Sequence, residues 1–286
     1  MTPSEATDFE THRSFLAGLA YRMLGSVAEA EDVVQDAFLR WARSDASSVV
    51  HPRAYLARVV TRLCLDRMKS ATSRREQYVG TWLPEPVVAA PEEPMADDLS
   101  IALLLTLERL SPLERAAFLL HEVFDMDYGD IARALGRSEE ACRQLATRAR
   151  QHVRDERPRF TPSDAHRDKL FAAFEAAMTS GDVETFAQLL ADDAVLYADG
   201  GGKRAAALDP IRGKENILQL YAAVIAVRGL FQRGELERAS INGMPGFILH
   251  GGDGVQTTAF EVEASGDRIV AIYTVRNPDK LRHLAS

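Results

Sequence analysis

The sequence predicts a multidomain chain in which two all-α domains precede an α+β domain. Three observations lead to this fold class. Apolar side chains recur at helical spacing through most of residues 9–154. A proline-rich stretch at 71–97 interrupts this pattern. Beyond Pro162, helical segments give way to alternating apolar and polar residues between Gly-bearing turns, as in antiparallel strands.

The first all-α domain contains three predicted helices. The first covers residues 9–24, and Ser26 with Glu29 forms a capping box that begins the second. That second helix has one apolar stripe and carries acidic side chains on its opposite face. A Ser- and Asp-rich break at 44–51 follows, and Pro52 opens a third helix that runs to about residue 69.

The second all-α domain follows the prolines. Helices are predicted over 99–110, 112–123, 127–135 and 139–154, and the last two are separated by residues 136–138. A short helix, a tight turn containing Gly and a longer basic helix are typical of a helix-turn-helix. Taken alone, the pattern leaves open an amphipathic hairpin with a solvated arginine face.

The charge of the chain is unevenly spread. The formal net charge of −8 argues, as an average, against binding to nucleic acid. Residues 51–80, however, carry seven basic and two acidic side chains, and residues 133–159 carry eight arginines and four acidic side chains. Such basic segments in an acidic chain are where a phosphate backbone would be held.

Several other kinds of site are not expected. No apolar run reaches the roughly 18 to 20 residues of a membrane span, and the N-terminus lacks a signal-like segment. We therefore expect a cytoplasmic protein with no membrane partner. Cys64 and Cys142 lie in apolar helical patterns and are interpreted as free buried thiols, and neither a metal site nor a cofactor is expected.

Four strings in the helical part resemble a known family. They are AEDVVQDAFLRW at 30–41, PRAYL at 52–56, RLCLDRMK at 62–69 and LSPLER at 110–115. The first resembles the polymerase-binding helix of sigma region 2, and the next two resemble its −10 segment. The last, continued through Arg150, resembles sigma region 4, which reads the −35 element. Residues 9–157 as a whole resemble the extracytoplasmic-function sigma factors.

This resemblance implies roles for the matching positions. Core RNA polymerase would be bound by Glu31, Asp32, Gln35, Asp36, Phe38 and Trp41. The −10 element would be held by Arg53, Arg58, Arg62, Asp66, Arg67 and Lys69, and the 44–51 loop would accept a flipped-out base. The −35 element would be read by Ser138, Glu140, Arg143, Gln144, Thr147, Arg148 and Arg150. Arginine can pair bidentately with guanine, and glutamine with adenine.

The α+β domain resembles the SnoaL-like branch of the NTF2-like fold. Its predicted helices are 166–179, 182–191 and 213–227, and its predicted strands are 194–198, 232–242, 246–250, 255–264 and 268–276. The resemblance implies a cone with an apolar pocket, which leaves an unknown small-molecule ligand open. Acid–base candidates for a catalytic pocket are Tyr197, Asp199, Asp209 and His250.

Three further strings resemble the sigma-factor subgroup with a fused SnoaL-like extension. They are Trp82, Leu83, Pro84, Glu85 and Pro86 in the linker; Asp199, Gly200, Gly201, Gly202 and Lys203 in the third domain; and Asn277, Pro278, Asp279, Lys280 and Leu281 near its end. The resemblance implies a regulatory interface that controls the sigma domains in cis. We expect Trp82 to pack against the third domain, and Asp199 and Lys203 to pair with charges of the sigma domains.

The expected domains are region 2 at 1–72, a Pro-rich linker at 73–98, region 4 at 99–160 and a SnoaL-like regulatory domain at 164–286. The expected function is an alternative sigma factor, not an enzyme, with core RNA polymerase and promoter DNA as partners. Two alternatives stay open: a ligand-responsive one-component DNA-binding regulator, and a SnoaL-like cyclase or isomerase fused to DNA-binding helices. Residues 9–69 favour the sigma factor, because a simple helix-turn-helix regulator does not need them.

Overall fold

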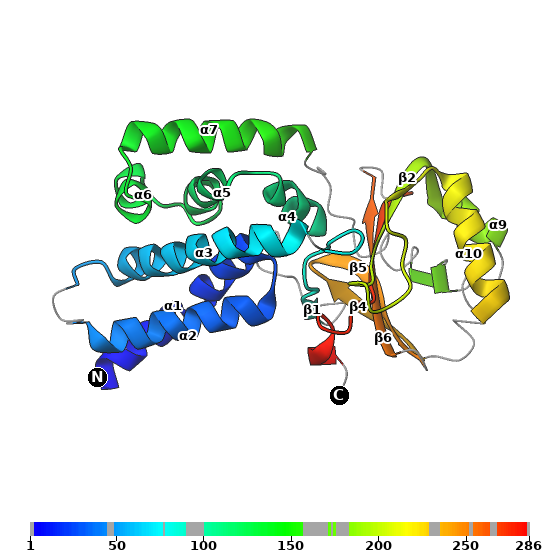
Figure 1. Ribbon diagram of the computed structural model, residues 1–286, viewed down its shortest axis with the longest axis horizontal. Coiled ribbons are helices and arrows are strands. Elements are labelled where there is room, and N and C mark those ends of the chain that lie inside the picture. The colour runs from blue at the N-terminus through cyan, green and yellow to red at the C-terminus, as the bar shows by residue number, and fades with distance from the viewer. Residues whose placement is uncertain are drawn as a thin grey trace. The chain divides into compact units, whose positions relative to one another are not determined.

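The computed structural model describes residues 3–44, 49–76, 78–89, 100–156, 171–172, 174–175, 183–228, 235–251, 254–263 and 268–284. They form two compact units (Figure 1). The first consists of Met1–Glu76 and Leu103–Arg157, and the second of Gln77–Ala102 and Pro158–Ser286. The described elements of the first unit are helical, and the second unit combines helices with a sheet, as the predicted fold class requires.

The N-terminal half of the first unit contains α1 (Pro3–Leu24), α2 (Val27–Arg43) and α3 (Pro52–Glu76). The chain turns between α1 and α2 at Gly25, whose φ of 70° suits glycine. Ser26 then caps α2, because its side chain accepts a hydrogen bond from the Glu29 N–H at 3.2 Å. The apolar stripes of the three helices meet in one core that includes Leu16, Val33 and Leu56.

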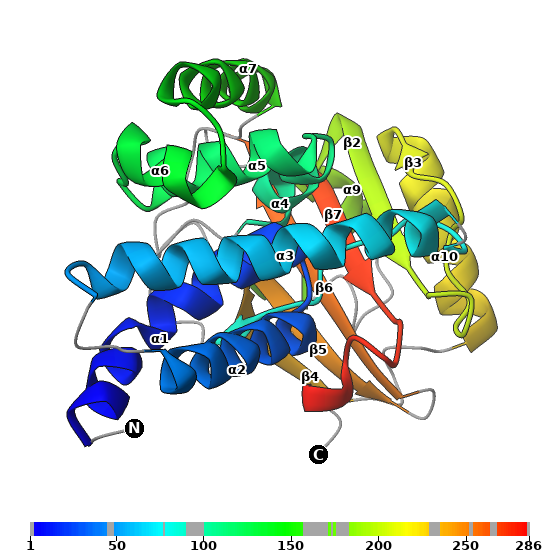
Figure 2. The ribbon, with the colours of Figure 1, turned by 60° about the vertical axis from the view of Figure 1, so that its left-hand side comes forward.

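The C-terminal half of the first unit contains α4 (Ile101–Glu108), α5 (Pro112–Phe118), a π-helical turn η2 (Leu119–Val123), α6 (Tyr128–Leu135) and α7 (Glu139–Glu156). Gly136 ends α6 in the left-handed conformation, with φ 64° and ψ 43°. The predicted helix-turn-helix is therefore formed by α6 and α7. In both ribbon views, α3 lies between α1–α2 and α4–α6, and α7 lies beyond them (Figures 1 and 2).

A buried arginine joins the two halves of the first unit. Arg115 of α5 is 1% exposed, and its Nη1 donates to the Met23 carbonyl oxygen at 2.7 Å. The same nitrogen lies 2.7 Å from Oε1 of Glu108. Burial lowers the pKa of Arg115 to about 10. This side chain satisfies a carbonyl at the C-terminal end of α1 and fixes α5 against it.

The second unit is built on a seven-stranded sheet with the order β1-β4-β5-β6-β7-β2-β3. Its strands are β1 (Val88–Ala89), β2 (Leu190–Asp199), β3 (Ile211–Arg212), β4 (Glu235–Ile241), β5 (Met244–Gly251), β6 (Gly254–Val262) and β7 (Ile269–Val275). Strand β2 runs parallel to β7, and the other neighbours are antiparallel. Helices α9 (Val183–Leu189) and α10 (Lys214–Arg228) cover one face, and η3 (Arg282–Leu284) follows the sheet.

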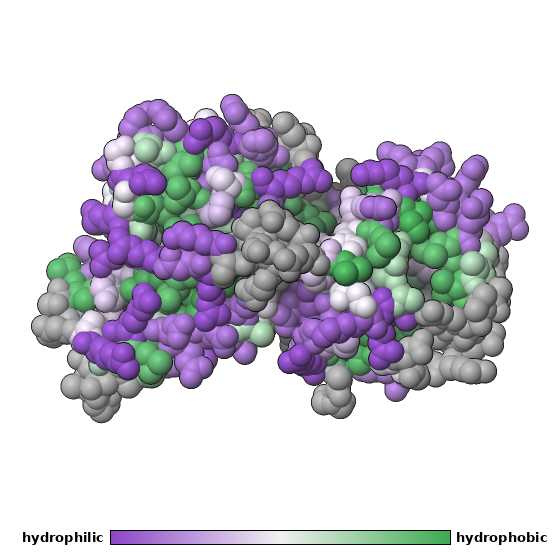
Figure 3. Space-filling model, in the orientation of Figure 1, coloured by the Kyte–Doolittle hydropathy of each residue, from purple (hydrophilic) through white to green (hydrophobic). Residues whose placement is uncertain are grey.

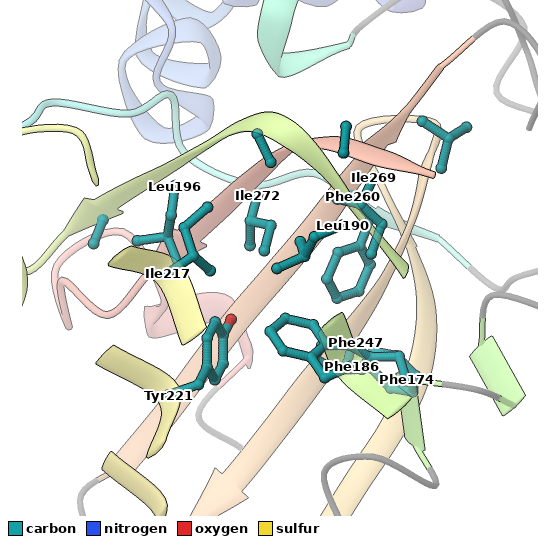
Figure 4. Packing of buried hydrophobic residues seen from close by; sticks show 14 of the residues in the cluster. Phe174, Phe186, Leu190, Leu196, Ile217, Tyr221, Phe247, Phe260, Ile269 and Ile272 are labelled. Atoms are coloured by element: carbon teal, nitrogen blue, oxygen red, sulfur yellow. The ribbon is translucent and has the colours of Figure 1, made fainter. Parts of the chain in front are cut away.

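This order of helices and strands confirms the α+β class and the SnoaL-like arrangement. The predicted helix 182–191 is shorter in the structure. Helix α9 ends at Leu189, and strand β2 begins at Leu190. Most of the predicted helix 166–179 lies outside the described residues. The sheet and the helices enclose an apolar core, whose labelled side chains converge from β2, β5, β6, β7, α9 and α10 (Figure 4).

Residues 78–89 of the expected Pro-rich linker belong to the second unit. Val88 and Ala89 pair with Ile241 and Ser240 as strand β1. The Asn242 N–H also donates to the Val87 carbonyl oxygen at 2.8 Å. An exposed edge strand leaves backbone groups unpaired, and this stretch satisfies those of β4.

We predict that Arg115→Ala destabilises the first unit by roughly 3–5 kcal/mol, because it removes the buried cation that donates to the Glu108 carboxylate and to the Met23 carbonyl oxygen. Denaturant unfolding, with hydrogen exchange followed in α1 and α5, measures this loss. Arg148→Ala is the control, because Arg148 is 60% exposed in its pair with Glu114 and should cost less than about 1 kcal/mol. Equal losses in the two variants would contradict the assignment.

Candidate nucleic-acid and protein interfaces

The acidic face expected to bind core polymerase lies on α2. Glu31, Asp32 and Gln35 are exposed there, and Asp36 is half-buried beside them. Leu39 is 45% exposed and lies one turn beyond Gln35. Sequence reasoning missed Leu39, although its helical phase places it with Gln35 and Glu31. The leucine adds an apolar contact point to a face of carboxylates.

Of the two aromatic residues expected at the same interface, Trp41 is buried in the helical core and Phe38 is half-buried. Trp41 is 1% exposed, and its ring lies 5.8 Å from that of Tyr55, centroid to centroid. Phe38 packs edge-on against Phe9, with ring centroids 5.1 Å apart. The prediction that Trp41 contacts polymerase directly is therefore wrong, because the surrounding helices cover its side chain. Its role is to hold α2 against the neighbouring helices.

Arg67, expected at the −10 element, connects α3 to the acidic face of α2. Its guanidinium lies 3.4 Å from Oδ2 of Asp32 and 3.2 Å from Oδ2 of Asp36. It also donates to the Glu29 carbonyl oxygen at 3.3 Å. The structure thus places this arginine with two carboxylates that the sequence assigned to a different partner.

The other α3 charges divide into two groups. Arg53 and Arg62 donate to carbonyl oxygens of the second helical half, at Phe124 and Ala134, over 3.1 and 3.3 Å. Lys69, in contrast, pairs with Asp66 at 2.9 Å on an exposed surface. The hydrogen bond from Lys69 lowers the pKa of the Asp66 carboxyl.

A cavity of about 260 Å³ opens beside the loop that was expected to accept a flipped-out base. The loop and the start of α3 form one wall, and α6 forms the other. The lining residues are Val49, Val50, His51, Ala54, Tyr55, Arg58, Asp130 and Arg133. The guanidinium of Arg58 lies 5.1 Å from the centroid of the Tyr55 ring. Residues 45–48 of this loop lie outside the described residues.

Helix α7 has the polar face expected to read the −35 element. Ser138 caps the helix, because its Oγ accepts a hydrogen bond from the Ala141 N–H at 3.2 Å. The exposed residues near the N-terminal end of this face are Glu140, Arg143, Gln144, Thr147 and Arg148. Arg150 is half-buried and donates to Glu122. Hydrophilic residues line the edge of the molecule where α7 lies (Figure 3).

Contacts within α7 and with Tyr128 of α6 position this polar face. Arg143 pairs with Glu139 at 2.9 Å and lies over the Tyr128 ring, 5.1 Å from its centroid. The Gln144 amide donates to Oε1 of Glu140 at 3.2 Å. These exposed contacts are weak in water, so the side chains can exchange them for base edges.

In the second unit, the three short strings meet at one buried carboxylate. Asp199 is 0% exposed. Its Oδ1 accepts hydrogen bonds from the Tyr78 hydroxyl at 2.5 Å and the Gly201 N–H at 3.0 Å. Its Oδ2 accepts from the Leu83 N–H at 2.9 Å and from the Lys280 ammonium at 2.7 Å. We call Tyr78, Leu83, Asp199, Asn277 and Lys280 the Asp199 clasp.

Lys280 also holds the aromatic residues of segment 78–89. Its ammonium lies 4.3 Å from the centroid of the Trp82 ring and 5.1 Å from that of Tyr78. It donates as well to the Leu83 carbonyl oxygen. The Asn277 amide donates to the Tyr78 hydroxyl at 2.8 Å. Trp82 thus packs against the third domain, as expected.

The expected pairing of Asp199 with a charge of the sigma domains is wrong. Asp199 takes its partners from its own unit. Lys203 pairs with Asp279 on an exposed surface of the same unit. The physical reason is burial, because a fully buried carboxylate needs a partner that is buried with it. Sequence reasoning also missed Tyr78, whose pKa is raised by burial and by the hydrogen bond to Asp199.

The acid–base candidates of the third domain do not gather in its interior. Aromatic side chains cluster in that interior, namely Phe174, Phe186, Tyr221, Phe247 and Phe260 (Figure 4). Asp199 is held in the clasp and Asp209 is exposed. His250 lies 3.7 Å from Oε2 of Glu237, and Tyr197 stacks on Tyr273.

Within the described ranges, no cluster of three or more His, Cys, Asp or Glu side chains is arranged to hold a metal ion. Among those same residues, no helix combines the length and the apolar character needed to cross a bilayer.

Two family models match the first unit. Sigma-70 region 2 matches residues 9–74, and Sigma-70, region 4 matches residues 100–153. These matches correspond to α1–α3 and to α4–α7.

Whole-chain likeness is found in Mycobacterium tuberculosis. The ECF RNA polymerase sigma factor SigJ is 38% identical over 291 residues, covering 96% of this chain and 93% of its own. The probable ECF RNA polymerase sigma factor SigI is 38% identical over 189 residues, covering 64% and 65%. The crystal structure of SigJ matches with a TM-score of 0.78 and 36% identity over 97% of this chain and 98% of its own. Because that likeness spans both units, the chain belongs to the extracytoplasmic-function (ECF) RNA polymerase sigma factors, with α1–α3 as region 2, α4–α7 as region 4 and a SnoaL-like second unit.

Proposed function

We propose that the chain directs core polymerase to promoters through three faces of its first unit. The acidic face of α2 binds polymerase, the basic face of α3 holds the −10 element, and α7 reads the −35 element. The observation that carries this proposal is the separation of charge in an acidic chain, with carboxylates gathered on α2 and arginines on α3 and α7. Acting with polymerase on DNA, the protein works in the cytoplasm.

The test is run-off transcription with purified core polymerase on a library of promoters. Promoter-dependent transcripts are expected from the full chain. Their absence across the library would contradict the proposal. The proposal assigns neither an enzymatic role nor a small-molecule ligand to the second unit.

We further propose that the second unit controls the sigma regions through the Asp199 clasp. Half of the residues between the end of α3 and the start of α4 lie in segment 78–89, which the second unit holds. A chain spans at most ~3.3–3.6 Å per residue, so this segment, once released, could extend to at most roughly 40 Å between regions 2 and 4. The clasp therefore limits how far the two promoter-reading regions can separate.

Polymerase binding is expected to depend on the exposed face of α2. Glu31→Lys should weaken the affinity for core polymerase about tenfold, roughly 1.4 kcal/mol, because it places a cation where basic clamp helices would dock. Fluorescence anisotropy with labelled sigma factor measures this change. Glu10→Lys makes the same change of charge on exposed α1 and should bind like wild type. Equal affinities for the two variants would contradict the assignment of α2.

Specificity for the −35 element is expected to reside in Arg143 and Gln144. Replacing either with Ala should weaken binding to the preferred promoter by roughly 1–3 kcal/mol, which lowers transcription from it. The same change should relax the preference at one base position. Run-off assays on promoters carrying each −35 substitution measure both effects. Gln151→Ala, an exposed change two turns further along α7, is the control. A uniform loss on every −35 sequence would indicate phosphate contact instead of base reading.

Breaking the clasp is expected to release segment 78–89. Lys280→Met leaves the buried Asp199 carboxylate without its cation, so hydrogen exchange in residues 78–89 should rise and run-off transcription should increase. Lys203→Met is the matched control, because its pair with Asp279 is half-exposed and weak. Faster exchange in Lys280→Met without any change in transcription would contradict control through the clasp.

A further inference from the structure

Tyr128, the first residue of α6, contacts two arginines of helix α7. Its ring faces the guanidinium of Arg143, with 5.1 Å between the guanidinium carbon and the ring centroid. Hydrogen bonds that Arg150 donates to Glu122 and to the Tyr128 hydroxyl raise the pKa of the Arg150 guanidinium. One side chain of α6 therefore contacts α7 at two positions about two turns apart.

The Tyr128 ring is itself held on two sides. The His121 ring packs against it, with ring centroids 4.2 Å apart and ring planes inclined by 36°. Nδ1 of His121 lies 3.0 Å from the Met126 carbonyl oxygen, which fixes the orientation of the imidazole. Tyr128 also packs against the buried cluster that includes Leu145 of α7. Packing on both sides limits the rotamers of the tyrosine, so its ring is a rigid support for the cation of Arg143.

The two contacts of Arg143 differ in what they leave for DNA. Glu139 pairs with Nη2 of Arg143 at 2.9 Å across an exposed surface, and such a pair is weak in water. A base edge can replace this carboxylate. The Tyr128 ring, in contrast, attracts the cation through its π face and leaves the N–H donors of the guanidinium to other acceptors. Arg143 can therefore keep the ring contact while it donates to O6 and N7 of guanine.

We propose that Tyr128 is a positioning residue for recognition of the −35 element: its ring fixes the guanidinium of Arg143 and so sets a base preference that the tyrosine does not itself read. This inference rests on the proposed base-reading role of Arg143. Gln144 is held by Glu140 of its own helix, so the preference set by Gln144 does not depend on the ring. An exposed cation–π contact changes an equilibrium about two- to fivefold, which gives the size of the expected effect.

The first experiment measures base preference with and without the ring, by run-off transcription with core polymerase on promoters that carry each −35 substitution. Tyr128→Leu should lower the preference about two- to fivefold at the position that Arg143→Ala relaxes, and leave the position that Gln144→Ala relaxes unchanged. Tyr128→Phe should keep the wild-type preference. Both Tyr128 variants lose the hydroxyl contact with Arg150, so only the ring distinguishes them. Equal preferences in the two variants, or a uniform loss on every −35 sequence in Tyr128→Leu, would overturn the inference.

A matched control separates positioning from loss of packing. Leu113 packs against the same buried cluster as Tyr128, so Leu113→Ala should lower the unfolding temperature of the first unit while every −35 preference stays as in wild type. A relaxed preference in Leu113→Ala at the Arg143 position would overturn the inference. The double variant Tyr128→Leu with Arg143→Ala should show the same preference as Arg143→Ala alone, because the ring acts through the arginine. A further loss of preference in the double variant would count against it.

The second experiment observes the contact in the free protein and needs neither polymerase nor DNA. In the full chain with isotope-labelled arginine, the Nε–H resonance of Arg143, identified by its loss in Arg143→Lys, should be displaced by the ring current of Tyr128. The displacement should disappear in Tyr128→Leu and persist in Tyr128→Phe. An Arg143 resonance at the same position in all three proteins would overturn the inference.

The two experiments together distinguish the inference from the proposed function on which it rests. A ring-current displacement combined with unchanged −35 preferences in Arg143→Ala would contradict base reading by Arg143, and the inference would fail with it. A preference that Arg143→Ala relaxes and Tyr128→Leu leaves intact would overturn the inference alone.

Discussion

Arginine side chains that donate to carbonyl oxygens at helix ends hold the two sigma regions together. Arg115 reaches the Met23 oxygen at the end of α1, Arg53 reaches the Phe124 oxygen, and Arg62 reaches the end of α6. These carbonyls have no partner within their own helices, so a guanidinium stabilises them. Arg115 is buried, which makes its contact part of the fold, whereas the other two are exposed and exchangeable. Burial thus distinguishes the Arg115 contact from the two that solvent can reach.

The second unit applies a similar constraint to the chain between the two regions. Asp199, with 0% exposure, is stabilised by Lys280 and by hydrogen bonds from Tyr78 and Leu83, both of which lie just beyond α3. One buried ion pair therefore fixes residues far apart in the sequence. Loss of its cation is costly because the carboxylate cannot reach water. The proposed control of region 2 and region 4 through their linker requires a connection of this kind.

Local signals predicted most of the helical core, and long-range contacts account for what the sequence missed. Ser26 with Glu29, and Gly136 with Ser138, mark helix ends by chemistry that acts within a few residues. Tyr78 carries no such signal, because its partner Asp199 lies 121 positions away. The strings around Trp82, Asp199 and Lys280 were grouped by resemblance, yet the partners of Asp199 were wrong, since spacing does not reveal burial. Likewise, the two-residue strand β1 exists only because β4 offers an edge.

The proposal that regions 2 and 4 separate when the protein acts at a promoter can be tested as a distance. Spin labels at Ser14→Cys in α1 and Gln151→Cys in α7 report on the two regions, since both positions are exposed and the natural cysteines are buried. Pulsed electron double resonance should give one narrow distance in the free protein. In the complex with core polymerase and promoter DNA, the account predicts a longer distance. An unchanged distribution in a complex that makes transcripts would contradict it.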